Sequence, residues 1–154
     1  RSIGYALYED EPLKITICTK TYGYLGNDFA DILRENKIEC EFSDPDFTVL
    51  MLSINTDIKR LFEVLSSVKM LPPITKFPPK FEKAEKVLSV QNAMLSKSEE
   101  INIEKSEGRI LADMNISCPP AVPIAVCGEK INKNTIECFK YYGIKTCKVI
   151  KKTQ

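Results

Sequence analysis

The chain has 154 residues, of which 44% are hydrophobic and 28% are charged, a composition typical of a folded protein with an apolar core. Its formal net charge of +1 gives no overall field that would favour nucleic acid or a membrane surface as a partner. No apolar run approaches the roughly 18 residues that a transmembrane helix requires, so no membrane segment is expected.

Residues 1–70 have the pattern of a small α/β unit in which helices pack on a sheet. The continuous apolar run at 47–54 is typical of a central strand covered on both faces. Asn27 is the expected N-cap of the first helix. In chain order the predicted elements are a strand at 12–20, a helix at 27–37, strands at 38–42 and 47–54, and a helix at 55–68.

Four prolines within residues 71–80 predict a stiff, extended connector, which we place at 71–88. Residues 89–154 are then expected to form a second α/β subdomain. Its predicted elements are a short helix after Ser89, an alternating segment at 100–116 that turns at Gly108, a helix at 132–143 and a strand at 144–150. The predicted fold class is α/β (α+β): a small mixed sheet with packed helices, followed by a proline-linked second α/β subdomain.

Histidine is absent, which excludes Ser–His and Cys–His nucleophile systems and most zinc sites. Neither a nucleotide-phosphate loop nor metal-ligand spacing occurs, and no metal site is expected. The six cysteines are widely spaced, lack a CxxC pair and stand partly at apolar positions. Reduced thiols and a cytoplasmic location are therefore the better prediction.

The segment ISCPPAVPIAVCGEKI (116–131) is an apolar run stiffened by prolines that ends in Gly128 and one carboxylate, Glu129. A carboxylate on an apolar loop is partly desolvated and can bind a cation strongly. The sequence equally allows Glu129 to cap the following helix or to pair with Lys130 or Arg109.

Two further carboxylates, Asp44 and Asp46, flank Pro45 in a turn before the predicted strand at 47–54. Such residues mainly accept hydrogen bonds from turn amides. Arg109 follows Gly108, where an arginine is expected to bind backbone carbonyls or a carboxylate, which is a structural role.

The segment ILADMNISCPPAVPIAVCGEKI (110–131) resembles the C-terminal signature of the ornithine/lysine/arginine decarboxylases. Residues 12–65 and 87–95 are similar to other parts of the same enzymes. The matching signature positions are Gly108, Arg109, Ile110, Pro119, Pro120, Pro123, Gly128, Glu129 and Ile131. The chain departs from the family pattern at Asp113, Cys118, Ala121 and Cys127.

This resemblance implies a fold-type-I enzyme that uses pyridoxal 5'-phosphate (PLP) to decarboxylate arginine, lysine or ornithine for polyamine synthesis. The family's cofactor lysine follows a histidine in the large domain, and this chain has no histidine. We therefore expect a fragment, the small domain plus the C-terminal domain, that neither binds PLP covalently nor catalyses a reaction by itself. The parent enzyme is expected to be a homo-oligomer through the large domain.

Within such an enzyme, the residues expected to serve the substrate channel are Glu129, Gly128, Asp44 and Asp46. The residues expected to form the structural motif are Gly108, Arg109, Pro119, Pro120 and Pro123. Two other functions remain open. The order of elements in residues 1–70 also occurs in amino-acid-sensing regulatory modules, and the proline-rich loop suggests a protein-docking surface. The Pro-Pro and Gly-Glu signature favours the enzyme, and the buried-type aliphatic residues between the prolines argue against docking.

Overall fold

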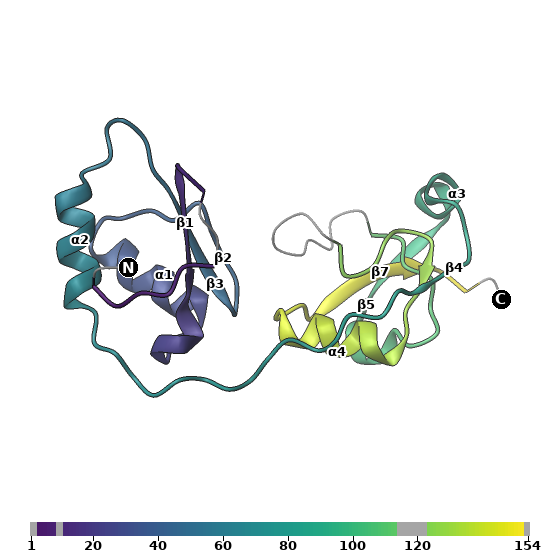
Figure 1. Cartoon of the computed structure of the whole chain (residues 1–154). Coiled ribbons are helices and arrows are strands. Elements are labelled where there is room, and N and C mark those ends of the chain that lie inside the picture. Colours follow the sequence, from purple (N-terminus) through teal and green to yellow (C-terminus); the bar gives the residue numbers. More distant parts are fainter. Residues whose placement is uncertain (1–2, 9–10, 114–122, 153–154) are drawn as a thin grey trace. The chain divides into compact units, whose positions relative to one another are not determined.

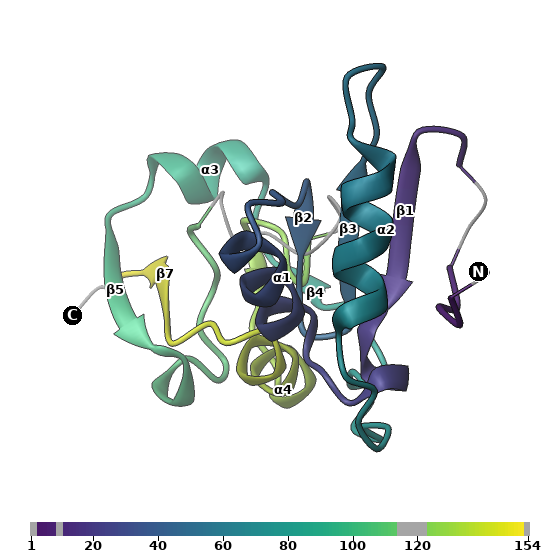
Figure 2. The ribbon, with the colours of Figure 1, turned by 90° about the vertical axis from the view of Figure 1, so that its left-hand side faces the viewer.

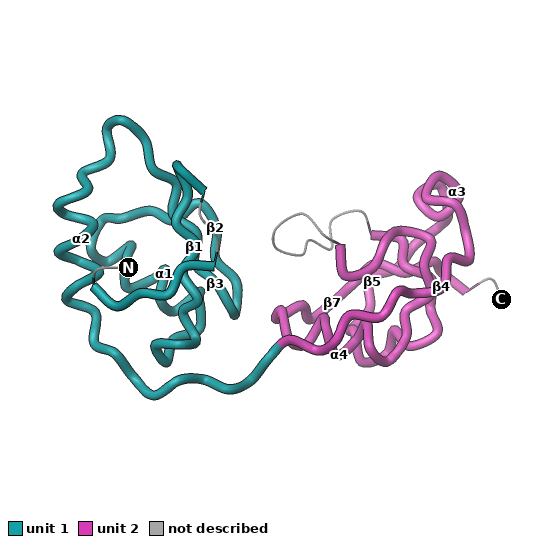
Figure 3. Tube along the Cα trace, viewed as in Figure 1, with its two compact units in different colours: residues 1–77 teal, residues 78–154 magenta. Residues whose placement is uncertain are grey.

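The computed structural model describes residues 3–8, 11–113 and 123–152. It divides into two compact units, residues 1–77 (unit 1) and residues 78–154 (unit 2), as Figure 3 shows. Each unit has its own cluster of buried hydrophobic side chains. Among the described residues, no helix is long and apolar enough to cross a membrane.

Unit 1 contains a three-stranded sheet made of β1 (Lys14–Cys18), β2 (Phe42–Ser43) and β3 (Phe47–Met51). The strand order is β1-β3-β2, and both pairs are antiparallel, so the sheet is not mixed as the sequence suggested. The predicted strand at 38–42 is reduced to β2, with Glu41 donating one further backbone bond to Val49.

Two helices, α1 (Gly26–Glu35) and α2 (Ile58–Ser67), cover one face of this sheet (Figures 1 and 2). That face carries Ile17 and Leu50, which are almost fully buried. Met51, the next residue along β3, faces the opposite side of the sheet and is 51% exposed. Strand β3 is therefore central, but the expectation that both of its faces are covered is wrong within unit 1, because both helices pack on the same side.

Helix α1 begins one residue earlier than predicted, and Asn27 is not its cap. The N-cap is Leu25, without a side-chain hydrogen bond. Gly26 starts the helix where a Cβ would lie 2.1 Å from the Phe47 carbonyl oxygen, so no larger residue fits there. The Asn27 side chain instead accepts a hydrogen bond from Ser43 Oγ at 2.9 Å. Close packing against the turn before β3 thus determines where this helix starts.

Among its described residues, unit 2 contains two small antiparallel ladders and two α-helices (Figure 1), together with a short 3-10 helix at Ile103–Lys105. The elements are β4 (Glu85–Lys86) paired with β6 (Glu129–Lys130), β5 (Ser98–Asn102) paired with β7 (Thr146–Ile150), and helices α3 (Val90–Leu95) and α4 (Lys133–Tyr141). Strand β4 lies inside the segment expected to be a connector. Helix α4 is capped by Asn132, whose side chain accepts from the Thr135 N–H at 2.7 Å.

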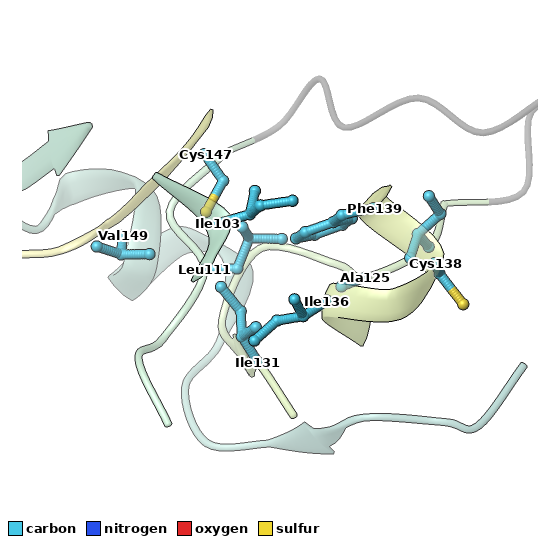
Figure 4. Close-up of a cluster of buried hydrophobic side chains, with 10 residues drawn as sticks. Ile103, Leu111, Ala125, Ile131, Ile136, Cys138, Phe139, Cys147 and Val149 are labelled. Carbon is cyan, nitrogen blue, oxygen red and sulfur yellow. The ribbon is translucent and has the colours of Figure 1, made fainter. Parts of the chain in front are cut away.

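The core of unit 2 forms where α4 meets the β5–β7 ladder and the segment around Leu111 (Figure 4). Phe139, Leu111 and Val149 are fully buried there. Leu111 forms an isolated bridge with Val149, so its segment extends the ladder beside β7. This arrangement supports the 108–111 and 128–131 segments, which hold most of the motif residues that the structure describes.

Candidate functional site

Glu129 lies in β6, and its carboxylate closes the turn that leads into this strand. Oε2 accepts a hydrogen bond from the Val126 N–H at 2.8 Å, and the Glu129 N–H donates to the Val126 carbonyl at 3.0 Å. The Glu129 carbonyl in turn accepts from the Leu111 N–H at 2.8 Å. The residue is partly buried, and its carboxylate is held in place by its own turn.

The three contacts that the sequence allowed for Glu129 are made by other residues. Lys130 Nζ lies 3.9 Å from Glu85 Oε2, and the Arg109 side chain forms an ion pair with Glu99. The cap of the following helix, α4, is Asn132.

Gly128 joins three segments of unit 2 through its backbone. Its carbonyl accepts from the N–H groups of Val87 and Leu88, both at 3.0 Å, and its N–H donates to the Leu111 carbonyl at 2.8 Å. Its φ is +93°, and a Cβ would lie 2.5 Å from the Leu88 carbonyl oxygen. Only glycine satisfies both the left-handed backbone and this close approach.

Arg109 links β5 to the end of β7 through two hydrogen bonds. Its Nη2 atom donates to Glu99 Oε1 at 2.6 Å and to the Ile150 carbonyl at 2.7 Å. The Arg109 side chain is only 14% exposed, whereas that of Glu99 is 37% exposed. Arg109 thus binds one carboxylate and one backbone carbonyl.

Gly108 has a φ of +73°, and its N–H donates to the Ile131 carbonyl at 2.8 Å. It lines a hollow of about 360 Å³ together with the charged residues Glu85, Glu107 and Lys130. Glu129 is not among the residues that line this hollow.

Pro123 is exposed at the end of the described part of the loop. Pro119 and Pro120 lie outside the described residues, as do Cys118 and Ala121.

Asp44 is buried, and its carboxylate holds the turn between β2 and β3. Oδ1 accepts from the Asp46 N–H at 2.8 Å and from the Phe47 N–H at 2.6 Å. Burial raises the pKa of this carboxyl above its ordinary value, although the two backbone hydrogen bonds act in the opposite direction. Asp44 thus accepts hydrogen bonds from two turn amides, which is the structural role that the sequence predicted for it.

Asp46 forms an ion pair that the sequence did not predict. The Lys20 ammonium lies 2.7 Å from Asp46 Oδ1 and also donates to the Lys76 carbonyl at 2.6 Å. The side chains of Lys20 and Asp46 are only 10% and 11% exposed. A lone lysine after a strand gives no signal of such a pair, because most lysines in that position are solvated.

The four residues expected to serve a substrate channel are divided between the units. Asp44 and Asp46 belong to unit 1, whereas Gly128 and Glu129 belong to unit 2.

Comparison with known proteins identifies the second half of the chain. The family described as "Orn/Lys/Arg decarboxylase, C-terminal domain" matches residues 76–151. Unit 2 belongs to this family.

Curated proteins that are similar to this chain extend the likeness to both units. An arginine decarboxylase of Bacillus subtilis is 28% identical over 144 residues, covering 85% of this chain and 29% of that protein. An uncharacterized protein of the same organism is 30% identical over 137 residues, covering 82% of this chain and 28% of that protein. The chain therefore spans less than a third of the length of these relatives.

Solved structures of decarboxylases show the same fold. The constitutive lysine decarboxylase of Escherichia coli matches with a TM-score of 0.64 at 17% identity, covering 92% of this chain and 32% of that chain. A lysine decarboxylase of Francisella novicida matches with a TM-score of 0.61 at 19% identity, covering 92% and 31%. The predicted α/β fold class is confirmed by this likeness.

The buried lysine among the described residues does not fit the role of the lysine that holds PLP. A lysine that binds PLP as a Schiff base must be able to react as the neutral amine. Among the described lysines only Lys20 is buried, and its ammonium is held by the Asp46 carboxylate and the Lys76 carbonyl. These contacts occupy the nitrogen atom that would have to form the Schiff base, so Lys20 does not fit the role of a cofactor lysine.

The cysteines that the structure describes lack the features of a nucleophilic or metal site. All of them are free thiols, and burial raises the pKa of each, which lowers the thiolate fraction at neutral pH. No group of three or more Cys, Asp or Glu side chains with metal-binding geometry occurs among the described residues. The thiols concerned are Cys18, Cys40, Cys127, Cys138 and Cys147.

Proposed function

We propose that this chain is the C-terminal part of a PLP-dependent decarboxylase of a basic amino acid, either arginine, lysine or ornithine. In the parent it would help to close the active site and the substrate channel, and the parent would act in cytoplasmic polyamine synthesis as a homo-oligomer. The observation that carries this proposal is the family match over residues 76–151, joined to curated relatives that span both units. The cofactor is assigned to the remainder of the parent, because Lys20 does not fit it.

Glu129 is the residue proposed to receive the distal cation of the substrate. Its carboxylate is positioned by the bond to Val126, and its backbone is fixed beside Gly128 and Leu111. A carboxylate that is already ordered loses little conformational entropy when it binds a cation. The turn around Glu129 therefore supports a binding role without excluding its structural one.

The charge of Glu129 can be tested separately from its hydrogen bond. In the full-length parent, Glu129→Gln keeps an oxygen that can accept from Val126 but removes the negative charge. We expect the KM for the basic amino acid to rise about tenfold, equivalent to about 1.4 kcal/mol, with a smaller change in kcat.

Glu85→Gln provides a matched control. Glu85 lies on β4, opposite Lys130 of β6, and is also a carboxylate near the same ladder. This variant should leave KM unchanged. An unchanged KM in Glu129→Gln, or an equal rise in both variants, would show that Glu129 does not bind substrate.

A second candidate function is an amino-acid-binding regulatory module, and one feature of unit 1 favours it. A hollow of about 230 Å³ lies between residues 37–39 and the start of α2. Its lining combines apolar side chains with groups of both charge signs, as a zwitterion requires. These include Leu50, Leu61, Lys37, Arg60, Glu39 and Asp57.

Calorimetry distinguishes the two functions. Titration of the 154-residue chain with arginine, lysine and ornithine should give no stoichiometric heat if the chain is only an enzyme fragment. Saturable binding that is lost in Arg60→Met would favour the regulatory module.

A further inference from the structure

Residues 69–76, called the strap below, are bound along unit 1. The Leu71 N–H donates to the Tyr22 carbonyl at 3.1 Å, and the Ile74 N–H donates to the Lys20 carbonyl at 2.9 Å. These residues all belong to unit 1. The first residues of the proline-rich connector are therefore held by the fold of that unit.

Gly23 allows the strap to approach unit 1 closely. Its φ is +81°, and a Cβ there would lie 2.4 Å from Leu71 Cβ and 2.7 Å from the Pro72 carbonyl oxygen. Next to it, Tyr24 Oη donates to the Lys69 carbonyl at 2.8 Å. A side chain at position 23 would therefore have to displace the strap.

The prolines explain why a few hydrogen bonds can hold the strap. Pro72 and Pro73 have locked φ angles, so the strap loses less backbone freedom on docking than an ordinary segment would. Neither proline has an N–H group, so neither needs an acceptor in unit 1.

The Lys20 side chain connects the strap to a second part of unit 1. Its ammonium donates to the Lys76 carbonyl of the strap at 2.6 Å and to Asp46 Oδ1 at 2.7 Å. The neighbouring Thr19 is fully buried and donates from Oγ1 to the Asp46 carbonyl at 3.3 Å. Asp46 is thus held by two successive residues of the 3-10 helix Thr19–Tyr22, to which the strap is also bonded.

The turn that contains Asp46 supports the start of two elements. Asp44 Oδ1 accepts from the N–H groups of Asp46 and Phe47, and Phe47 is the first residue of β3. At Gly26, where α1 starts, a Cβ would lie 2.2 Å from the Asp44 carbonyl oxygen. A change in this turn therefore reaches both the central strand and α1.

Beyond the strap, the chain is bound within unit 2. Asn134, on α4, donates from Nδ2 to the Lys80 carbonyl at 2.7 Å, and its Oδ1 accepts from the Glu82 N–H at 3.0 Å. The strap and the partners named above lie in unit 1 alone.

We propose that the strap is a conformational device whose docking is coupled to the order of the turn at residues 44–47, with Lys20 as the positioning residue between them. When the strap is docked, the Lys76 carbonyl helps to hold the Lys20 ammonium beside Asp46. When the strap detaches, the ammonium loses that acceptor and the turn loses part of its support.

Such coupling is reciprocal, so loosening the turn must also weaken the docking of the strap. A partner that binds the strap in competition with unit 1 would loosen the start of β3. Neither the family match nor the decarboxylase function is needed for this inference.

The test is amide hydrogen exchange, followed by NMR on the whole chain. Gly23→Ala displaces the strap by its clash with Leu71 and Pro72. Gly4→Ala is the matched control, because Gly4 also has a positive φ, +91°, but a Cβ there has no neighbour within 4 Å. Both variants carry left-handed strain, and only the first carries the clash.

Two pairs of amides report the result, the strap amides (Leu71 and Ile74) and the turn amides (Asp46 and Phe47). Their exchange is measured relative to the core amides of Ile17 and Leu50, so that a loss of overall stability cancels. In Gly23→Ala, the strap amides should exchange about tenfold faster on this relative scale, and the turn amides should follow in the same direction. Gly4→Ala should leave both ratios at their wild-type values.

A double-mutant cycle tests the route through Lys20. Lys20→Met should speed the relative exchange of both the strap amides and the turn amides. Gly23→Ala added to Lys20→Met should then have no further effect on the turn amides, because the side chain that carries the coupling is absent. An undiminished further effect would overturn the role of Lys20.

Two other results would overturn the proposal. Strap amides that exchange in the wild type as fast as an unstructured peptide would show that the strap is not docked. Turn amides that keep their relative exchange in Gly23→Ala, while the strap amides lose protection, would show that the two parts are uncoupled. Should Gly23→Ala fail to fold, Pro72→Gly/Pro73→Gly loosens the strap without a clash and carries the same expectations.

Discussion

The Lys20–Asp46 ion pair places two charges in a poorly solvated part of unit 1. Removing one partner leaves the other charge buried and uncompensated. We expect Lys20→Met or Asp46→Asn alone to lower the free energy of unfolding of unit 1 by about 3 kcal/mol. In Lys20→Met/Asp46→Leu the loss should be smaller than the sum of the single losses, because no charge is then left buried.

Urea unfolding followed by NMR signals of unit 1 measures these changes. The exposed pair of Glu11 and Lys14, 3.6 Å apart, is the control, and Glu11→Gln should cost less than about 1 kcal/mol. Strictly additive losses in the double variant would mean that Lys20 and Asp46 do not stabilise each other.

Asp44 should make the stability of unit 1 depend on pH in the direction opposite to an ordinary salt-bridged carboxylate. Burial raises its folded-state pKa above the ordinary value of 3.8. The contribution of Asp44 is therefore most favourable below that value, and it is lost as pH rises through the raised folded-state pKa. Asp44→Asn keeps a side-chain oxygen for the amides of Asp46 and Phe47 but cannot ionise.

The measurement is the difference in unfolding free energy between wild type and Asp44→Asn from pH 3 to pH 7. The wild type should lose stability relative to the variant as pH rises from the ordinary value of 3.8 through the raised folded-state pKa. A difference that is constant, or that grows in favour of the wild type, would contradict the assignment.

At the scale of elements, residues 87–88 and 111 can form backbone hydrogen bonds with residue 128 because Gly128 has no side chain. We expect Gly128→Ala to destabilise unit 2 by about 3 kcal/mol, because it combines left-handed strain with a clash against the Leu88 carbonyl. Gly108 also has positive φ, but a Cβ there has no neighbour within 4 Å. Gly108→Ala should therefore cost only the strain, about 1 kcal/mol.

Urea unfolding followed by NMR signals of unit 2 compares the two alanine variants. Similar losses of unfolding free energy in both variants would show that the backbone near Leu88 can move to admit a Cβ atom at position 128 at no cost.

The helices were the most predictable elements, because their apolar stripes are strong local signals. The predictions at 55–68 and 132–143 correspond to α2 (Ile58–Ser67) and α4 (Lys133–Tyr141). Strand lengths were less predictable. Residues 38–42 alternate in burial, yet only β2 (Phe42–Ser43) forms, because a ladder needs a partner strand in register as well as alternation.

At the scale of the whole molecule, the proposal that the cofactor belongs to the remainder of the parent predicts the behaviour of this chain with PLP. Mixing the purified chain with PLP should give no specific visible absorption band of lysine-bound cofactor. The physical reason is that the side-chain nitrogen of Lys20, the buried lysine among the described residues, is already bonded to the Asp46 carboxylate and the Lys76 carbonyl.

The control for this experiment is Lys20→Met, which should show the same weak and non-specific spectrum as the wild type. A stable, stoichiometric band in the wild type that disappears in Lys20→Met would overturn the assignment of the cofactor to the rest of the parent.

The sequence alone determined the α/β class, the two main helices and the decarboxylase resemblance. These depend on local periodicity and on short motifs such as Gly108–Arg109 and Gly128–Glu129, which are readable without knowing which residues meet. Tertiary structure alone decided the partners of several polar and charged side chains. Glu129 binds the backbone of its own turn, Asp46 binds Lys20, and Asn134 holds the connector. Each of these bonds depends on a backbone atom or a distant side chain that folding brings near, and no spacing in the sequence encodes that distance.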